Sequence, residues 1–372
     1  MHVLIAPNAF KNSLTAEEAA QAIARGLSRS RLTAGIETFP VGDGGDGTGD
    51  LLIQHLHGRR VPAKARDPLG RPIETYFGLI GSSTAIVEMA NASGLRLLEP
   101  GARNPIQTSS AGTGDLIRAA LDHGAGCILI GMGGSATVDG GTGILQALGA
   151  RFTDGNGQLL HDLPAQLPDL ASIDLSGLDP RLTTTQLIVL CDVTNPLTGP
   201  RGAAAVFGPQ KGADQRTVHR LESALKKFAG IAFRQTGIDL AAIPRTGTAG
   251  GAAAGLHGLL NATLVSGIDY FLELTGFNAA LDRSTHVITG EGSIDEQTLQ
   301  GKAPFGVAVR AKAKGLPVIG LAGRIPAGTT ALRPYFDELI LINPRRARLP
   351  EALAHTATNL ERTAMEWGNR HA

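Results

Sequence analysis

The sequence predicts an α/β fold with two domains, and three observations support this expectation. The chain has 372 residues, which is long enough for two domains that each bury a core. Apolar runs of strand length alternate with helical segments, a pattern typical of βαβ units around a parallel sheet. The chain has 49 glycines among its 372 residues, more than the usual share of about 7%. They cluster at the ends of these runs, where such sheets bind ligands.

The beginning of the chain predicts a β-α-β unit. Val3–Ala6 is a short apolar strand, and 36–41 is a second strand. Between them a helix is expected to begin with Ser13 or Thr15 as its N-cap and to continue to about Leu27.

The end of the chain returns to the same pattern. A final amphipathic helix is expected at about 350–368. Three more strands are expected at 284–289, 317–322 and 338–342. Residues 1–60 and 265–372 therefore supply five strands that alternate with helices, which predicts one flavodoxin-like domain interrupted by the middle of the chain.

Residues 61–264 change character and predict an inserted, mixed α/β domain. It begins with a meander of short strands with turns at Pro68–Gly70 and Gly81–Ser83, and a long helix is expected at about 214–236. The expected strands lie at 61–67, 74–80, 84–89, 127–130 and 186–191.

Composition and charge give no indication of several classes of partner. A net charge of +1 and an aromatic content of 4% give no support for nucleic-acid or anionic-membrane binding. No apolar run reaches the roughly 18 residues of a membrane span, and no signal peptide is expected. Cys127 and Cys191 lie in apolar runs and are expected to be free buried thiols of a cytoplasmic protein. These features do not determine the oligomeric state of the protein.

The stretch Ile130–Gly143 has the strongest chemical pattern. It contains six glycines between an apolar strand and a helix, so its N–H groups can approach a ligand closely. Ser135, Thr137 and Thr142 add hydroxyl donors, and Asp139 adds a negative charge. This mixture suits phosphate together with a metal ion, although a turn without a ligand is the simpler alternative.

Acidic loops follow other strands. Gly42–Gly47 matches the spacing of a dinucleotide fingerprint, but Asp43 and Asp46 would repel a pyrophosphate unless Mg²⁺ were present, or would face substrate hydroxyls. Asp192 and Asn195 follow a buried strand and suit metal or hydroxyl binding, although Asn-Pro also favours a plain turn.

Further candidates lie near both ends of the chain. Glu291 and Asp295 form a second acidic pair at a βα junction, and Lys302 lies two turns on. Lys11 lies at the edge where parallel strands bind ligands. Thr246–Ala252 is a second candidate anion cradle.

Glycine-and-hydroxyl cradles together with acidic loops predict phosphoryl transfer, in which catalysis is mostly positioning and charge stabilisation. The Walker A motif, the protein-kinase motifs and paired zinc-binding histidines are absent from the sequence. Two other functions remain open: an NAD(P)-dependent dehydrogenase of a small hydroxy acid, and a non-catalytic sensor that binds a sugar acid.

Six segments, in the same order and over nearly the whole chain, resemble the bacterial glycerate kinase family. These are Ala6–Ser13, Val41–Thr48, Gly131–Gly141, Cys191–Leu197, Phe207–Gly212 and Thr289–Thr298. The resemblance implies ATP-dependent phosphorylation of D-glycerate, typically to 2-phosphoglycerate, with Mg²⁺. It also implies a flavodoxin-like domain interrupted by a second domain, with the active site in the cleft between them.

The resemblance assigns no role to single residues, so their roles are hypotheses. The ATP-binding set is predicted as Gly133, Gly134, Ser135, Thr137, Gly140, Gly141 and Thr248. The catalytic set is predicted as Lys11, Asp192, Glu291 and Asp295. D-Glycerate is expected to bind Asn8, Asp43, Asp46 and Asn195. Mg²⁺ is expected on Asp43 and Asp192.

Overall fold

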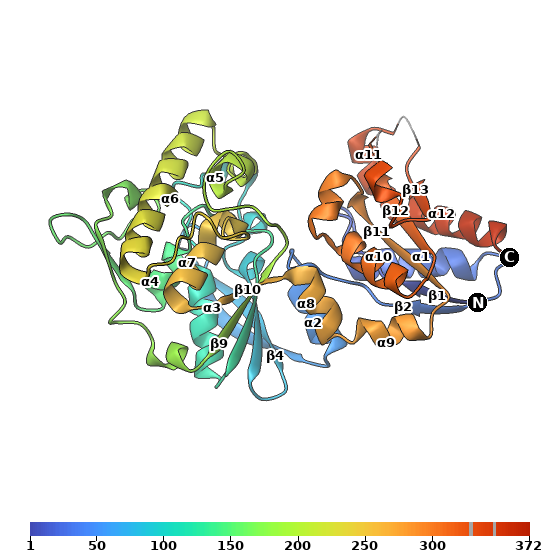
Figure 1. Cartoon of the computed structure of the whole chain (residues 1–372), viewed down its shortest axis with the longest axis horizontal. Coiled ribbons are helices and arrows are strands. Elements are labelled where there is room, and N and C mark those ends of the chain that lie inside the picture. Colours follow the sequence, from blue (N-terminus) through green and yellow to red (C-terminus); the bar gives the residue numbers. More distant parts are fainter. Residues whose placement is uncertain (327–329, 345–346) are drawn as a thin grey trace. The chain divides into compact units, whose positions relative to one another are not determined.

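The computed structural model describes residues 1–326, 330–344 and 347–372, and the chain folds into two compact units. The terminal unit consists of Met1–Asp43 and Ile268–Ala372, and the inserted unit consists of Gly44–Gly267. Figure 1 shows both chain ends in the terminal unit. The sequence predicts the boundaries after residues 60 and 264, whereas the compact units divide after Asp43 and Gly267.

The terminal unit contains a five-stranded parallel sheet in the order β13-β12-β11-β1-β2. Numbered within this unit the order is 2-1-3-4-5, the flavodoxin-like arrangement, so the predicted fold of this part is confirmed. The strands are β1 His2–Ile5, β2 Gly35–Thr38, β11 His286–Ser293, β12 Val318–Arg324 and β13 Glu338–Leu341.

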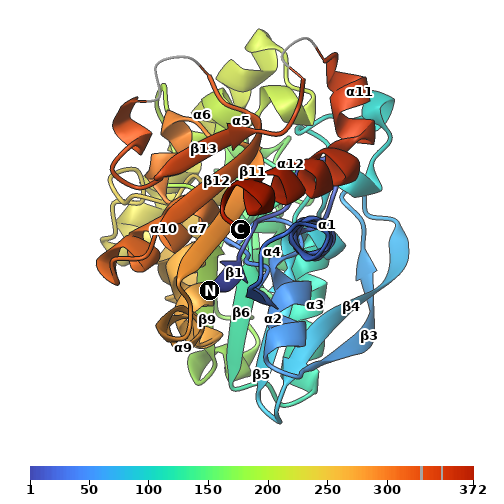
Figure 2. The same cartoon turned by 90° about the vertical axis from the view of Figure 1, so that its right-hand side faces the viewer.

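Helices complete the terminal unit. On one face of its sheet, Ile23 of α1 and Trp367 of α12 are buried with Ile5 and Leu321 in one core, and Figure 2 shows α12 running beside α1. The helices are α1 Ala16–Ser28, α8 Gly267–Leu274, α9 Phe277–Asp282, α10 Ala303–Ala313, α11 Leu349–Ala354 and α12 Thr356–Arg370.

Two sequence predictions about helix ends have different outcomes. Thr15 rather than Ser13 is the N-cap of α1, because Thr15 accepts from the Glu18 N–H and Glu18 bonds back to the Thr15 N–H in a capping box. The single helix predicted at 350–368 is wrong. Its first turns form α11, and α12 starts afresh after His355.

The inserted unit is built on a mixed six-stranded sheet in the order β10-β9-β6-β5-β4-β3. The predicted meander is confirmed as the antiparallel strands β3, β4 and β5, and the remaining neighbours pair in parallel. The strands are β3 Arg59–Arg66, β4 Pro72–Ile80, β5 Thr84–Glu88, β6 Cys127–Gly131, β9 Gln186–Cys191 and β10 Thr263–Ser266. A small hairpin adds β7 Arg151–Thr153 and β8 Ser172–Asp174.

Two buried clusters hold the inserted unit together. One lies around Phe77, Ile117 and Ile130 at the sheet, and the other lies around Phe152 and Phe228. The helices are α2 Thr48–His55, α3 Ala111–Asp122, α4 Thr142–Ala147, α5 Ala203–Phe207, α6 Gln215–Thr236 and α7 Ala252–Leu260. Helix α2 packs on β4 and β5, which explains why the residues before 60 belong to this unit.

The predictions about thiols and membrane spans can also be compared with the structure. Both cysteines are free; Cys191 is buried as expected, but Cys127, the first residue of β6, is only half-buried. Burial raises the pKa of the Cys191 thiol to about 12. Within the described ranges, every helix is too short or too polar to span a bilayer.

Candidate active site

Four predicted site residues of the terminal unit lie at the carboxyl ends of β1 and β11. Asn8 and Lys11 follow β1, and Glu291 and Asp295 lie at or just after the end of β11. These two strands are neighbours, and the sheet extends from them in opposite directions, so they flank the point where α/β sheets bind ligands. The Asn8 N–H donates to the Gly290 carbonyl at 2.9 Å, which ties the loop after β1 to β11. Asn8 Nδ2 donates to Asp43 Oδ2 at 3.0 Å, and the Ala303 N–H donates to the same oxygen at 3.4 Å.

Glu291 is the most unusual group of this cluster. Its carboxylate is only 8% exposed and accepts a 2.9 Å hydrogen bond from Thr298 Oγ1, and Lys302 Nζ lies 3.9 Å from Oε1. Burial raises the pKa of Glu291 to about 7, with a further contribution from the negative charge of Asp43. Lys302, the Thr298 hydroxyl and Lys11 oppose that rise in pKa. Glu291 therefore titrates near neutral pH.

Asp295 has a different position from its predicted partner Glu291. Asp295 Oδ2 accepts from Ser293 Oγ at 3.0 Å, and the Asp295 N–H donates to Thr298 Oγ1 at 3.1 Å. Because Thr298 also bonds Glu291, Asp295 belongs to the turn that fixes the Thr298 hydroxyl beneath the Glu291 carboxylate.

In the inserted unit, three of the four predicted ATP-binding glycines use their N–H groups within the protein. The Gly133 N–H donates to the Gly44 carbonyl at 2.9 Å, the Gly140 N–H to the Gly250 carbonyl at 3.1 Å and the Gly141 N–H to Asp139 Oδ1 at 2.9 Å. Gly133 is required for close approach, because a Cβ there would overlap the Cα of Gly45. These glycines therefore shape the loop, and their N–H groups are already committed to protein acceptors.

Asp139 anchors this loop from inside. Its fully buried carboxylate accepts from the Ser110 N–H at 2.8 Å, from Ser110 Oγ at 2.6 Å and from the Gly141 N–H at 2.9 Å, with a longer 3.3 Å bond from the Gly143 N–H. One carboxylate thus joins the start of α3 to the start of α4. Its contacts make Asp139 a structural residue, although the sequence pattern offers it as a possible charge near a metal.

Three segments far apart in the sequence meet at this loop. The 246–252 loop packs on the 137–140 segment, with Ala249 and Gly250 in the left-handed region. The Gly247 N–H donates to the Asn195 carbonyl, which brings in the loop after β9. Asn195 Nδ2 donates to the Arg201 carbonyl at 2.8 Å, so its amide supports the loop. The half-buried Asp192 precedes it at the end of β9.

The inserted unit also contains two functional candidates that the sequence does not single out. Glu88, 3% exposed at the end of β5, accepts from the Gly49 N–H at 2.8 Å, and burial raises its pKa to about 7. Lys211, 2% exposed, donates to Ser135 Oγ at 2.8 Å and to the Thr137 carbonyl at 2.7 Å. An acidic residue ending an apolar strand was the available signal for Glu88, and the Phe207–Gly212 segment was the signal for Lys211.

The donor sets fit Mg²⁺ only in the mode in which substrate supplies most ligands. Among the described residues no three histidine, cysteine or acidic side chains gather into a cage. Mg²⁺ commonly takes one or two carboxylates and completes its shell with phosphate oxygens and water. The carboxylates of Asp43 and Asp192 suit that mode, whereas Asp46 pairs with the Arg96 guanidinium at 3.2 Å, a cation that opposes metal binding there.

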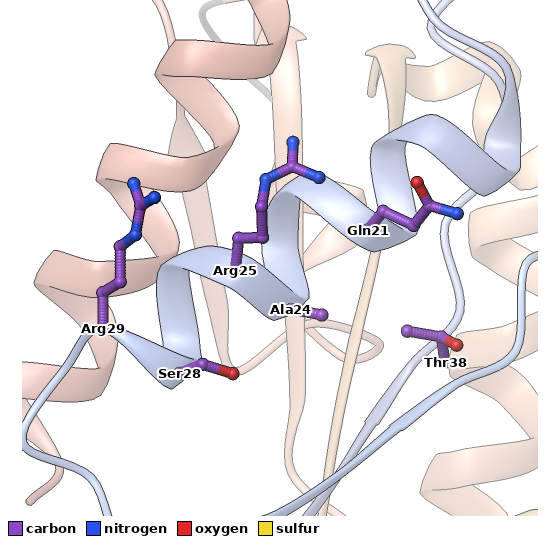
Figure 3. A pocket seen from close by; sticks show the side chains of 6 residues that line it. All are labelled: Gln21, Ala24, Arg25, Ser28, Arg29 and Thr38. Carbon is purple, nitrogen blue, oxygen red and sulfur yellow. The ribbon is translucent and has the colours of Figure 1, made fainter.

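A hollow beside α1 contains none of the predicted site residues. Figure 3 shows it lined by Gln21, Ala24, Arg25 and Ser28 of α1, by Arg29 directly after this helix and by Thr38 of β2. Both arginines bind Glu361 of α12, so their charge is partly neutralised. No carboxylate of the described residues lines the hollow, and its two arginines are already paired with Glu361, so it differs from the two clusters above.

Comparison with known proteins identifies the family. The family model described as "Glycerate kinase family" matches residues 3–371. A Bacillus subtilis protein named glycerate kinase is 46% identical over 98% of this chain and 96% of its own length. The glycerate 2-kinase of Escherichia coli K12 is 44% identical over 87% of this chain and 86% of its own length.

The fold agrees with this comparison. A crystal structure described as a glycerate kinase 2 from Salmonella typhimurium LT2 has a TM-score of 0.82 and 42% identity, covering 100% of this chain and 98% of that one. None of these similarities supports a dehydrogenase or a sensor. With its matching segments spread over both units, this chain belongs to the glycerate kinase family.

Proposed function

We propose that this chain transfers the γ-phosphoryl group of ATP to the 2-hydroxyl of D-glycerate and releases ADP and 2-phospho-D-glycerate. The observation that carries this proposal is family membership over residues 3–371. The choice of the 2-hydroxyl rests on the name of the Escherichia coli relative, glycerate 2-kinase. Because ATP is a cytoplasmic substrate, we also place the enzyme in the cytoplasm.

We assign the phosphates of ATP to the loop that follows β6. Ser135 and Thr137 lie in this loop, and Thr248 belongs to the neighbouring loop. The Thr137 hydroxyl is buried and has no protein partner within the described residues, and a buried unpaired hydroxyl calls for a ligand. Phosphate oxygens would accept from it.

We assign D-glycerate to the cluster in the terminal unit. Glu291 would accept the proton of the attacking hydroxyl, since a base with a pKa near neutrality has the right protonation state at working pH. Lys11 would neutralise the glycerate carboxylate. The Asn8–Asp43 pair would orient the remaining hydroxyl, because Asn8 fixes one oxygen of Asp43 by a 3.0 Å hydrogen bond.

Mg²⁺ enters the proposal as a partner of ATP. In the inserted unit, which carries the proposed phosphate site, Asp192 would supply one carboxylate to the ion, together with phosphate oxygens and water. When bound, the ion supplies positive charge that neutralises the β- and γ-phosphate oxygens.

The test is ATP consumption with D-glycerate and Mg²⁺, with phosphorus NMR of the product. A phosphorus signal coupled to one methine proton is expected, whereas coupling to a methylene pair would move the transfer to the 3-hydroxyl. Glu291→Gln, which keeps the size of the side chain, is expected to lower kcat by about 10²- to 10⁴-fold. Absence of turnover in the unmodified protein, or NAD(P) reduction with glycerate, would overturn the proposal.

A further inference from the structure

Lys211 is a buried lysine, which is unusual because its side chain carries a charged ammonium group. It lies in the short turn after α5, immediately before Gly212, which adopts a left-handed conformation and packs closely on the Arg103 carbonyl. Only 2% of Lys211 is exposed, and within the described residues no carboxylate lies within ion-pair distance of Nζ. Burying an ammonium group without a close counter-charge is costly. A functional gain must offset that cost if the residue is to be tolerated.

The hydrogen bonds of Lys211 fix the direction of a neighbouring hydroxyl. An ammonium group has three N–H donors and no acceptor, so Ser135 Oγ accepts from Nζ at 2.8 Å. The hydroxyl hydrogen of Ser135 must therefore point away from Lys211. The second bond, 2.7 Å to the Thr137 carbonyl, holds the next part of the same loop. Lys211 thus leaves Ser135 as an oriented donor.

Other donors around Ser135 have no protein acceptor. In the part of the chain that the structure describes, the N–H groups of Gly134 and Ser135 make no hydrogen bond, although the three neighbouring glycine N–H groups do. The Thr137 hydroxyl is fully buried and likewise unpartnered. Gly134 is exposed, whereas Ser135 and Thr137 beside it are buried. Three donors without a protein acceptor among the described residues, close to the ammonium group of Lys211, describe a site for a polyanion.

We propose that Lys211 is a positioning residue for the phosphate end of ATP: through Ser135 it aims a hydroxyl donor at a phosphate oxygen, and it places a positive charge beneath the loop. The ligand is a nucleoside polyphosphate, and the inference rests on the proposed ATP site at this loop. The proposed site contains fewer residues than the glycine pattern predicts, because its donors come from Gly134, Ser135 and Thr137 alone. Burial lowers the pKa of Lys211 to about 7, although the negative charges of Asp139 and Asp192 act to raise it. A bound phosphate would add negative charge and keep Lys211 protonated.

A purely structural role is the competing explanation, because the bond to the Thr137 carbonyl alone would tie two loops together. The two roles differ in which substrate responds. Direct titration of MgATP binding, together with separate KM values for ATP and D-glycerate, distinguishes them in the full-length protein. The variants are Lys211→Met, Ser135→Ala and the double substitution. The matched control is Lys226→Met, an exposed lysine of α6 paired with Glu222.

We expect Lys211→Met to weaken MgATP binding by about 10- to 100-fold, because a charge-assisted hydrogen bond is lost. The KM for D-glycerate should stay within about twofold of the unmodified value. Since Lys211 acts through Ser135, adding Ser135→Ala to Lys211→Met should cost less than Ser135→Ala costs alone. Lys226→Met should change neither constant.

Folding failure of the lysine variant would not remove the test. Ser135→Ala and Thr137→Val alter one hydroxyl each, and both should weaken MgATP binding with little change in melting temperature. MgATP binding by Lys211→Met and Ser135→Ala equal to that of the unmodified protein would overturn the inference alone. Equal losses for both substrates would also overturn it, in favour of a structural tie. Absence of MgATP binding by the unmodified protein would overturn the proposed ATP site and the inference with it.

Discussion

The environment of Glu291 predicts how the pH dependence of catalysis should move when Lys302 loses its charge. Glu291 has a pKa of about 7, and Lys302 lowers that pKa from 3.9 Å away. At this distance two unit charges interact by about 1 kcal/mol in bulk water and by about 4 kcal/mol at an effective dielectric constant of 20. Because Lys302 is 31% exposed, the lower figure is the better guide.

About 1.4 kcal/mol corresponds to one pKa unit, so Lys302→Met should raise the midpoint of the acid limb of kcat/KM for D-glycerate by about one pH unit. At pH 7 the ionised fraction of Glu291 would then fall from about one half to about one tenth. Activity at pH 7 should fall about fivefold from this cause, and raising the pH should recover that part of the loss. Any contact of Lys302 with substrate would lower the plateau but would not restore the original midpoint.

The assay is the initial rate of ADP formation at saturating MgATP from about pH 6 to pH 10, with ADP quantified by chromatography so that no coupling enzyme limits the range. Lys314→Met is the control, because Lys314 pairs with Asp282 on an exposed part of the same unit. An unchanged midpoint in an active Lys302→Met variant would refute Glu291 as the group that governs the acid limb. A comparable shift in Lys314→Met would instead indicate a general effect of net charge.

Four further predictions concern stability and are measured by thermal or urea unfolding. The raised pKa of Glu291 means that the folded state holds its proton more tightly than the unfolded state, so this stabilisation is complete below about pH 4.5 and is lost as pH rises to about 7; Glu291→Gln should therefore be more stable than the unmodified protein at pH 8, and a gain that persists undiminished at low pH would contradict the sign. Asp139→Ala leaves the donors of Ser110 and Gly141 unpaired and should cost on the order of 4 kcal/mol, and a loss below about 1 kcal/mol would show that the loop does not depend on this carboxylate. Gly133→Ala should cost about 1–3 kcal/mol or more by overlap with the backbone of the 44–46 loop, whereas Gly126→Ala, with open space around it, should be nearly neutral. Gly230→Ala on the exposed side of α6 should add about 0.5–1 kcal/mol, and a loss would mean that this helix needs its glycine.

The sequence predicts much of the fold because its local signals agree with one another. The five strands of the terminal unit have apolar runs of the right length, and the capping residues before α1 mark its start. The short strand β10 is missed because Thr263–Ser266 has few apolar residues and no strand-length alternation. It becomes a strand by pairing with the edge of β9, which is a tertiary effect.

The chemistry of the candidate site is less accessible from sequence, because the same residue type can carry opposite roles. Asp139 and Asp192 both follow strands in loops rich in turn residues, yet Asp139 is consumed by four protein donors and Asp192 is half-buried at the end of β9. A glycine pattern likewise indicates that another group packs closely on the backbone, but it does not distinguish a neighbouring loop from a ligand. Gly133 accommodates the backbone of Gly45, whereas Gly134 leaves its N–H without a protein acceptor in the described residues.

Three further ionisable groups are buried, and the effect of burial on their pKa distinguishes them. Glu88, Glu291 and Lys211 are each more than nine-tenths buried, and burial moves the pKa of each to about 7. In the described part of the chain only Glu291 among them has an ion pair, at 3.9 Å, so none is there for a strong salt bridge. Groups of this kind reduce stability, and protein cores exclude them unless a ligand or a proton transfer uses them. Glu291 and Lys211 have such uses in the proposed reaction.

Glu88 has no assigned use, and it accepts a hydrogen bond from the Gly49 N–H beneath the loop that carries Asp46. Its replacement by glutamine is therefore the most informative substitution after those of Glu291 and Lys211. A loss of kcat without a loss of stability in Glu88→Gln would extend the active site to the end of β5, and an increase in stability with unchanged kcat would confine Glu88 to supporting that loop.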